Sequence, residues 1–451
     1  MKNQKIVIAG GGSCFVLSKV KVILEKKEIF EGSEICLFDI DSHYFPMLIK
    51  ASNELCKREK VDIKITSTCN PKEAFENASF IYFTWGVGGK EALKNDIGIP
   101  TSFNIIGDET AGIGGTFMAQ RNIPVAVNYC KMIENICPDA WIISLTNPTN
   151  LIADAVRRET NVKFISICDC MCKFAMRWLP KVMNMPPFDR HYHVSEDLWP
   201  RAMGVNHYTW LVKLMVNGKD GYPFLRELIK ESKEKVISNN DSYARVDVSY
   251  HLFDAYNYFD IAPFHTQLYY EQNDCLERAQ DFDSSFYSGA FGWDKDKKLQ
   301  IEKIIEGADY DEAPWGNSKD YCFSLPTARL LIGIMASIIT NDGEEWGGIN
   351  FPNVGVISNL PQDAIVEGPS IINAMGVNPV PMGELPKPFV GLTHQLINWA
   401  ELSVDAALSG DKKILYQAIL ASPLVLEMRA AKEIMNKMLV VNSRFLPQYK
   451  I

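Results

Sequence analysis

This sequence has no long apolar run, no signal-peptide pattern and no excess of basic residues, and each of these observations excludes a class of protein. No apolar run approaches the ~20 residues of a membrane-spanning helix. The opening MKNQKIVIAGGGS breaks into a glycine run where a signal peptide would continue its apolar segment. Basic residues are in deficit, with 46 Lys and Arg against 55 Asp and Glu and a net charge of -9. We therefore expect a cytoplasmic protein that binds neither nucleic acid nor membrane.

Cysteine pairs at CxxC spacing are missing as well, although the chain has 11 cysteines. An odd number of scattered cysteines in a cytoplasmic chain predicts mostly reduced thiols that pack as small hydrophobic side chains. Only the group formed by Cys168, Cys170 and Cys172 invites a second interpretation. Within that group we interpret Cys170 and Cys172 as structural.

The pattern of the first half of the chain is an alternation of short runs rich in Ile, Val, Phe and Tyr with helical segments. It predicts an α/β fold with a Rossmann-like, doubly wound parallel sheet. The expected strands are 5–9, 34–40, 79–84, 141–146 and 163–168. After about residue 195, longer helical stretches over 222–238, 325–340 and 388–440 predict a mostly helical α+β domain.

The length of 451 residues also favours two domains, because one core seldom supports more than roughly 250 to 300 residues. We place the first domain at 1–195 and the second, which would hold substrate and metal and form oligomer contacts, at 196–451. No low-complexity linker separates them, so we expect the two domains to pack closely.

A glycine-rich turn follows the first expected strand. Gly10, Gly12 and Ser13 precede a helical pattern, so backbone N–H groups at the helix start can hold a pyrophosphate. The third glycine of GxGxxG is replaced by Phe15, which weakens the motif.

Two further features support a dinucleotide site. Asp39 ends the second expected strand, where a carboxylate binds an adenosine ribose and repels a 2'-phosphate, which favours NAD over NADP. The alternative is that Asp39 only caps the next helix. Gly86 and Gly88 follow another strand and let the backbone approach a ligand.

Polar and thiol side chains end the next two expected strands. Asn147 lies in SLTNPTN, and Cys168 and Asp169 lie in ISICDCM. Because the strands are parallel, their carboxyl ends lie along the same side of the sheet, where open α/β sheets bind ligands. The thiolate of Cys168 and the imidazole of His207, in MGVNHYTW, are suited to a divalent ion such as Mn, Fe, Co, Ni or Zn. The alternative is that Cys168 belongs to the core and His207 is structural.

These motifs together resemble glycoside hydrolase family 4, the NAD- and metal-dependent glycosidases. The resemblance rests on their order and rough spacing: GGGS, GVGG, GDETAGIGG, TNP, the Cys168-Asp169 pair, GVNHYTW and the stretch INFPNVGVISNLPQDAIVEGP. It covers nearly the whole chain. The motifs are specific jointly, although each alone is weak.

The resemblance implies roles for residues across the chain. Cys168 and His207 would be ligands of a manganese ion. Asp169 would be the general acid. The sugar would be held by Glu109, Asn147 and Asn206.

The implied reaction is redox-elimination. NAD takes hydride from C3 of the sugar, a base removes the C2 proton, the glycosidic bond breaks by elimination, water adds, and the hydride returns. There is no net redox change, and the pair of carboxylates used by ordinary glycosidases is not required.

The sequence departs from the family at two places. The phosphosugar branch has an arginine just before VGG, where this chain has Trp85 and Gly86, so we expect an unphosphorylated glycoside. The tyrosine base of that branch aligns with His265 or Thr266 in IAPFHTQLYY. His265 is our first candidate for the base because its ordinary pKa, about 6.5, suits proton abstraction near neutrality. Tyr269 and Tyr270 are the next candidates, and a packed aromatic wall is the alternative.

Two other functions compete with a glycosidase. An NAD-dependent 2-hydroxyacid dehydrogenase fits the Rossmann signals and TNP, but the chain lacks a GxHG-like turn for the catalytic histidine. A non-catalytic NAD sensor would need neither a metal nor an acid. We also expect a homodimer or homotetramer, as is common in the family.

Overall fold

The computed structural model describes residues 3–174, 179, 198–238, 246–279, 295–308, 310 and 321–449. Six parallel strands form the sheet of the first half, in the order β3-β2-β1-β4-β5-β6. They are β1 (Lys5–Ala9), β2 (Glu34–Phe38), β3 (Lys64–Thr68), β4 (Phe80–Phe83), β5 (Trp141–Ser144) and β6 (Lys163–Ile167). This order confirms the predicted Rossmann-like sheet.

β3 is the one strand of this half that the sequence analysis missed. Its sequence, KITST, has a single apolar residue, and none of its side chains is buried, because β3 is the edge strand of the sheet. By contrast β4, with the sequence FIYF, is buried throughout. The edge position explains why apolar content did not reveal β3.

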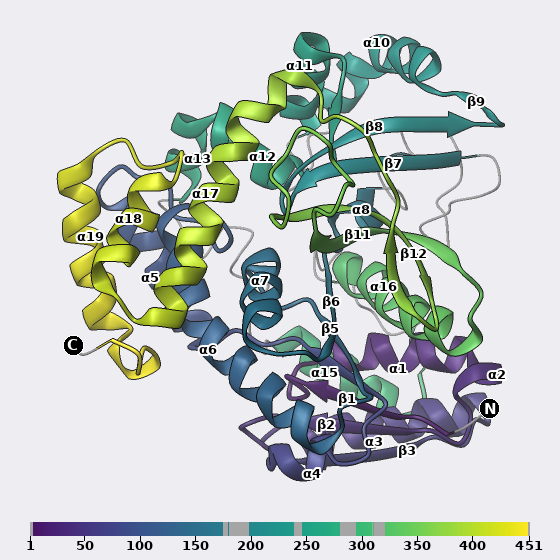
Figure 1. Ribbon diagram of the computed structural model, residues 1–451. Helices are drawn as coiled ribbons and strands as arrows, with labels where there is room; N and C mark the ends of the chain where they lie inside the picture. Colours follow the sequence, from purple (N-terminus) through teal and green to yellow (C-terminus); the bar gives the residue numbers. More distant parts are fainter. Residues whose placement is uncertain are drawn as a thin grey trace.

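The second half of the chain extends the same sheet with antiparallel strands (Figure 1). β11 pairs with β6, and the order continues β12-β7-β8-β10, with β13 beside β12 and β9 beside β8. Their bounds are β7 (Leu198–Val205), β8 (Tyr208–Val216), β9 (Lys219–Asp220), β10 (Phe259–Asp260), β11 (Glu344–Pro352), β12 (Ile365–Asn373) and β13 (Gly376–Pro379). The hydrogen-bonded sheet therefore crosses residue 195, and the domain boundary proposed there stays a prediction.

Helices cover both faces of the parallel sheet. Side chains along each strand point to the two faces in turn, so each face has its own buried cluster. In β1, Ile6 and Ile8 join one buried cluster while Val7 and Ala9 join another. The first cluster lies beneath α1 (Val16–Glu25), α3 (Phe45–Glu59) and α16 (Tyr321–Thr340), with α15 (Lys295–Ile305) against α3. The second lies beneath α4 (Pro71–Phe75), α6 (Gly112–Ile136), α7 (Thr149–Glu159) and α17 (Lys387–Ser409).

Helices from the end of the chain pack back onto its beginning (Figure 1). α17 lies on α6 and α7, and α19 lies on α5. The remaining elements are α2 (Lys27–Phe30), α5 (Gly89–Thr101), α8 (Cys170–Lys173), α10 (Tyr222–Ser238), α11 (Val246–Tyr256), α12 (Pro263–Tyr270), α13 (Gln272–Ala279), α18 (Lys412–Ala421), α19 (Met428–Val441) and the 3-10 helix η2 (Ser443–Phe445). The helical second half is thus confirmed, together with strands that the sequence analysis did not predict there.

Two features are absent from the described residues: a helix that could cross a membrane and a disulfide bond. Within them, no helix combines the length and the apolar character that crossing a bilayer requires. All the cysteines that the structure describes are free thiols.

Candidate active site

The glycine-rich turn after β1 is held tightly by its neighbours. The N–H groups of Gly10 and Gly11 both donate to the carbonyl of Phe38, at 2.9 Å. The N–H of Gly12 donates to Oδ2 of Asp39, also at 2.9 Å. Gly10 has φ +100°, and a Cβ there would lie 2.0 Å from the Thr84 carbonyl oxygen. Glycine is therefore required for packing, and Asp39 is fixed beside the turn with its carboxylate partly exposed.

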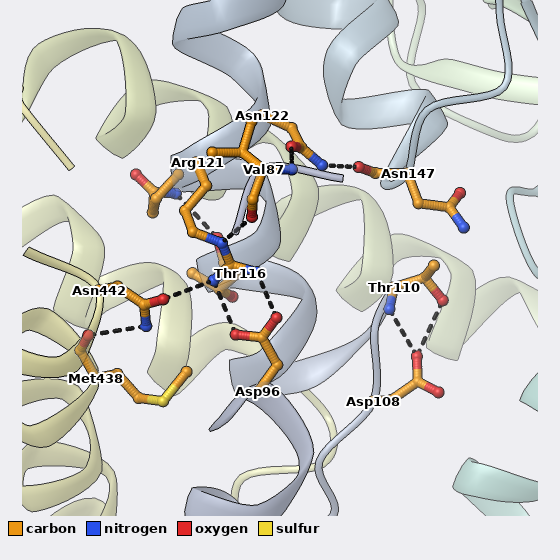
Figure 2. A network of polar contacts seen from close by, with 11 residues as sticks. Val87, Asp96, Asp108, Thr110, Thr116, Arg121, Asn122, Asn147, Met438 and Asn442 are labelled. Carbon is orange, nitrogen blue, oxygen red and sulfur yellow. Dashed lines mark hydrogen bonds and ion pairs between the residues drawn. The ribbon is translucent and has the colours of Figure 1, made fainter. Parts of the chain in front are cut away.

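The loop after β4 is fixed by α6 (Figure 2). Asn122 accepts from the N–H of Val87 at 2.9 Å and donates to the Asn147 carbonyl at 2.7 Å. Arg121 donates from Nε to the Val87 carbonyl at 3.0 Å and forms a buried two-pronged ion pair with Asp96. The loop that carries Gly86 and Gly88 and the turn that carries Asn147 are thus held by consecutive residues of one helix.

A cluster of potential metal ligands lies at the carboxyl end of β6, near the middle of the sheet. One ligand atom from each of Cys168, Cys170 and His207 lies within 4.8 Å of the other two. Two sulfurs and an imidazole form a donor set that fits a borderline divalent ion. Cys168 and His207 are the predicted ligands. Cys170 was interpreted as structural from the sequence, and the structure instead brings its thiol into this cluster.

The thiols of Cys168 and Cys170 interact directly. A hydrogen bond from Cys168 lowers the pKa of Cys170, and the same contact raises the pKa of Cys168, because a thiolate accepts from the thiol that remains. Burial, with the nearby charge of His265, lowers the pKa of His207. A neutral imidazole and a thiolate are the forms that bind metal ions.

Thr110, in the motif GDETAG, orients the ring of His207. Its hydroxyl donates to Oδ1 of Asp108 at 2.9 Å and lies 2.9 Å from Nδ1 of His207. A hydroxyl has one proton, so Thr110 must accept from His207 Nδ1–H. This arrangement leaves Nε2 of His207 with its lone pair, as a ligand to an ion requires.

His265 stacks on His207, with ring centroids 3.8 Å apart and planes 2° from parallel. Its Nδ1 lies 3.7 Å from Oδ2 of Asp108 and 3.4 Å from the Thr110 hydroxyl. Burial lowers the pKa of His265, but hydrogen bonding to Asp108 and its charge outweigh burial and raise the pKa overall. A base candidate from α12 therefore lies beside the ligand cluster.

Glu367 on β12 anchors the Asn206–His207 turn. It accepts from Asn206 at 2.8 Å and from Asn350 at 3.4 Å, and it also accepts from the Thr209 hydroxyl at 3.4 Å. Burial raises its pKa to about 7. The sequence analysis quoted the VEGP segment only for the resemblance and assigned Glu367 no role.

Two more carboxylates complete the site. Glu109 lies 3.3 Å from the Asn147 amide nitrogen, which donates to it, and burial together with Asp108 raises its pKa to about 7. Asp169 forms an ion pair with Lys173 at 2.7 Å and accepts from the Thr327 hydroxyl. Burial raises the pKa of Asp169, but Lys173 and Thr327 outweigh it and lower the pKa below its ordinary value. In this arrangement Asp169 is ionised.

A pocket opens beside these residues. Its walls include Asn206, His207, His265 and Tyr269, together with residues of α7 and α17. Tyr269 also packs edge-on against Tyr208, with centroids 5.6 Å apart, so both its predicted role and the aromatic wall remain compatible with its place. The described lining residues include no Lys or Arg.

Comparisons with known proteins identify the family. The model of the family 4 glycosyl hydrolases matches residues 5–185, and that of the family 4 glycosyl hydrolase C-terminal domain matches residues 202–425. A 6-phospho-alpha-glucosidase of Leptotrichia buccalis is 27% identical over 100% of both chains. An alpha-galactosidase of Bacillus subtilis is 27% identical over 99% of this chain and 100% of its own.

Solved structures show the same fold. A crystal structure of a 6-phospho-alpha-glucosidase from gut microorganisms, in complex with NAD and Mn2+, has a TM-score of 0.83 and 23% identity and covers 100% of both chains. At this identity the likeness establishes the fold. Because the family models match both halves of the sequence and all the motifs quoted for the resemblance, the chain belongs to family 4 of the glycosyl hydrolases.

Proposed function

We propose that this family 4 glycosidase cleaves a small glycoside by NAD-dependent redox-elimination with the help of a divalent metal ion. The observation that carries the proposal is the convergence of Cys168, Cys170 and His207, with the base candidate His265 stacked on His207. A hydrolase that relied on two carboxylates alone would have no use for such a cluster.

The nucleotide and metal sites have suitable residues. Asp39 and the turn around Gly10 would hold NAD, which would supply a hydride acceptor and donor for C3 of the sugar. The ligand cluster would hold the ion, which would supply Lewis-acid stabilisation of charge on the sugar oxygens.

Side chains of the pocket and of the neighbouring strand ends would carry out the remaining steps. Nδ1 of His265 faces Thr110 and Asp108, so Nε2 is the nitrogen that takes the C2 proton. Asn206 and Glu109 bind ring hydroxyls. The resemblance assigns the acid role to Asp169, which the ion pair with Lys173 keeps ionised, so the proton for the leaving oxygen would pass from the Lys173 ammonium to the Asp169 carboxylate and on to that oxygen.

The substrate class is the finer part of the proposal. The described lining residues support an unphosphorylated glycoside because they include no Lys or Arg, and the two arginines next to the lining, Arg157 and Arg158, are already paired with Asp154. Trp85, at the place of the phosphate-binding arginine, packs on Phe83 and Tyr129, with centroids 4.4 Å and 5.7 Å away. The names of several relatives favour the other candidate, a 6-phosphoglycoside.

A panel of matched nitrophenyl glycosides, free and 6-phosphorylated, tests both parts of the proposal. With NAD, Mn2+ and a reducing agent, we expect cleavage of a free glycoside and a higher kcat/KM than for its 6-phosphate. A strong preference for the phosphorylated member would overturn the substrate class alone. Cleavage that survives removal of both NAD and metal would overturn the reaction.

The expected homodimer or homotetramer is a separate proposal, which light scattering tests.

A further inference from the structure

Cys170 and Cys172, two residues apart, differ in where their thiols lie. Cys172, two residues later on α8, directs its sulfur to the carbonyls of Asp169, at 3.1 Å, and Pro326, at 3.6 Å. It therefore belongs to the packing against α16. The sulfur of Cys170 instead lies with the sulfur of Cys168 and a ring nitrogen of His207 in the ligand cluster.

Three separate local structures bring these atoms together. The N–H of Cys168 donates to the Gly348 carbonyl at 2.7 Å, and a Cβ on Gly348, which has φ +70°, would lie 2.2 Å from the Cys168 carbonyl oxygen. Cys170 is the first residue of α8. His207 takes φ +63° at the turn between β7 and β8, a conformation that non-glycine residues rarely adopt.

The spacing fits a shared ion. Two atoms bound tetrahedrally to one ion at about 2.0 to 2.3 Å are roughly 3.3 to 3.8 Å apart. The three ligand atoms already lie within 4.8 Å of one another. Small side-chain rotations therefore suffice to close them around one ion.

We propose that Cys170 is a third protein ligand, so that the ion of this enzyme is held by two thiolates and one imidazole. A set of two cysteines and one histidine leaves a fourth position open for substrate oxygens. Two soft sulfurs favour a thiophilic ion, Zn2+, Co2+ or Fe2+, over Mn2+, which is the weakest binder in the divalent series. This inference rests on the metal site of the proposed function.

Cobalt loading tests the ligand count without measuring activity. The reduced full-length protein is titrated with Co2+, and the near-ultraviolet thiolate-to-cobalt absorption is measured, because its intensity grows with the number of Co–S bonds. We expect Cys170→Ser and Cys168→Ser each to lose about half of the wild-type intensity per bound ion, and Cys172→Ser to keep all of it. An undiminished band in Cys170→Ser would overturn the proposal.

X-ray absorption at the zinc edge of the wild-type protein gives a second measurement that needs no variant. Two sulfur neighbours at about 2.3 Å are expected, and one would overturn the proposal. Competition dialysis should also show that Cys170→Ser loses at least about tenfold of the Zn2+ over Mn2+ preference. One sulfur with intact metal-dependent cleavage would remove only this inference, whereas a wild-type protein that binds no Co2+ would remove the metal site of the proposed function as well.

Discussion

The single proton of the Thr110 hydroxyl determines which ring nitrogen of His207 carries hydrogen and which is free to bind an ion. Because Thr110 donates to Asp108, it accepts from Nδ1 of His207 and leaves Nε2 for an ion. Asp108 also accepts from the N–H groups of Thr110 and Ala111, at 2.8 and 3.0 Å, and is fully buried. The segment GDETAG thus orients a residue that is distant in sequence.

Removing the hydroxyl should therefore weaken metal binding. Thr110→Val keeps the side-chain shape but leaves Nδ1–H of His207 without its acceptor, so we expect metal affinity to fall about 10- to 100-fold. Thr110→Ser keeps the hydroxyl and is the matched control. Calorimetric titration with the ion measures both variants. Equal affinities of Thr110→Val and the wild-type protein would contradict the orienting role.

Asp260, on β10, is a buried carboxyl whose oxygens lack hydrogen-bond partners of normal geometry. Burial raises its pKa from 3.8 to about 6. Since the folded pKa lies above the unfolded one, ionisation destabilises the fold, and stability is lost as the pH rises from about 4 through about 6.

Asp260→Asn should therefore raise the free energy of unfolding at pH 7, by about 1 to 3 kcal/mol, because the amide carries no charge. The gain should shrink towards pH 4, where the carboxyl of the wild-type protein is neutral. Urea unfolding of both proteins across this range measures the difference. A gain that does not depend on pH would contradict the assignment.

The residues that the sequence revealed are those that end strands or stand in short motifs. Asn147, Cys168 and His207 were predicted because strand ends and residue chemistry pointed to them, and their roles stay predictions. Cys170 and Glu367 were assigned no such role. Their contacts depend on side-chain direction at the start of α8 and on the pairing of β12 with β7, which join distant parts of the chain.

At the scale of elements, α6 links the nucleotide loop to the end of the chain. Arg121 pairs with Asp96 of α5 and donates to the side chain of Asn442, which follows α19, at 3.3 Å (Figure 2). Both members of the ion pair are fully buried. A buried pair of this kind is costly to break, because one charge is left without its partner.

A double-mutant cycle on this pair should show strong coupling. Asp96→Leu and Arg121→Met should each lower the free energy of unfolding by about 3 to 5 kcal/mol, and the double variant should lose clearly less than their sum. Denaturant unfolding measures all four proteins. Losses that add without coupling would show that the pair contributes only through packing.

Prediction from sequence succeeded unevenly among the elements. The buried parallel strands were clear because apolar β-branched and aromatic residues run through them. β7 and β8 were missed although they carry MGVNHYTW, since no alternation with helices marks an antiparallel extension of a Rossmann sheet. The pairing of β7 with β12 depends on a contact over more than 150 residues, between Gly204 and Glu367.

At the scale of the whole molecule, both expected ligand sites lie at the carboxyl ends of the parallel strands of one sheet. The turn after β1 and Asp39 lie on the nucleotide side, and the end of β6 carries the thiols. The antiparallel strands add His207 and Glu367 from the second half of the chain. This arrangement suits a reaction in which a cofactor and an ion act on adjacent carbons of one sugar.

The exchange of hydrogen at C2 of the sugar tests this account most directly. If His265 removes the C2 proton and solvent replaces it, product formed in D2O with NAD and metal will carry deuterium at C2, and no net NADH will accumulate. NMR or mass spectrometry of the released sugar measures the label, and His265→Ala should slow its appearance more than it weakens NAD binding. Cleavage that leaves C2 unlabelled and proceeds undiminished without NAD would contradict the account.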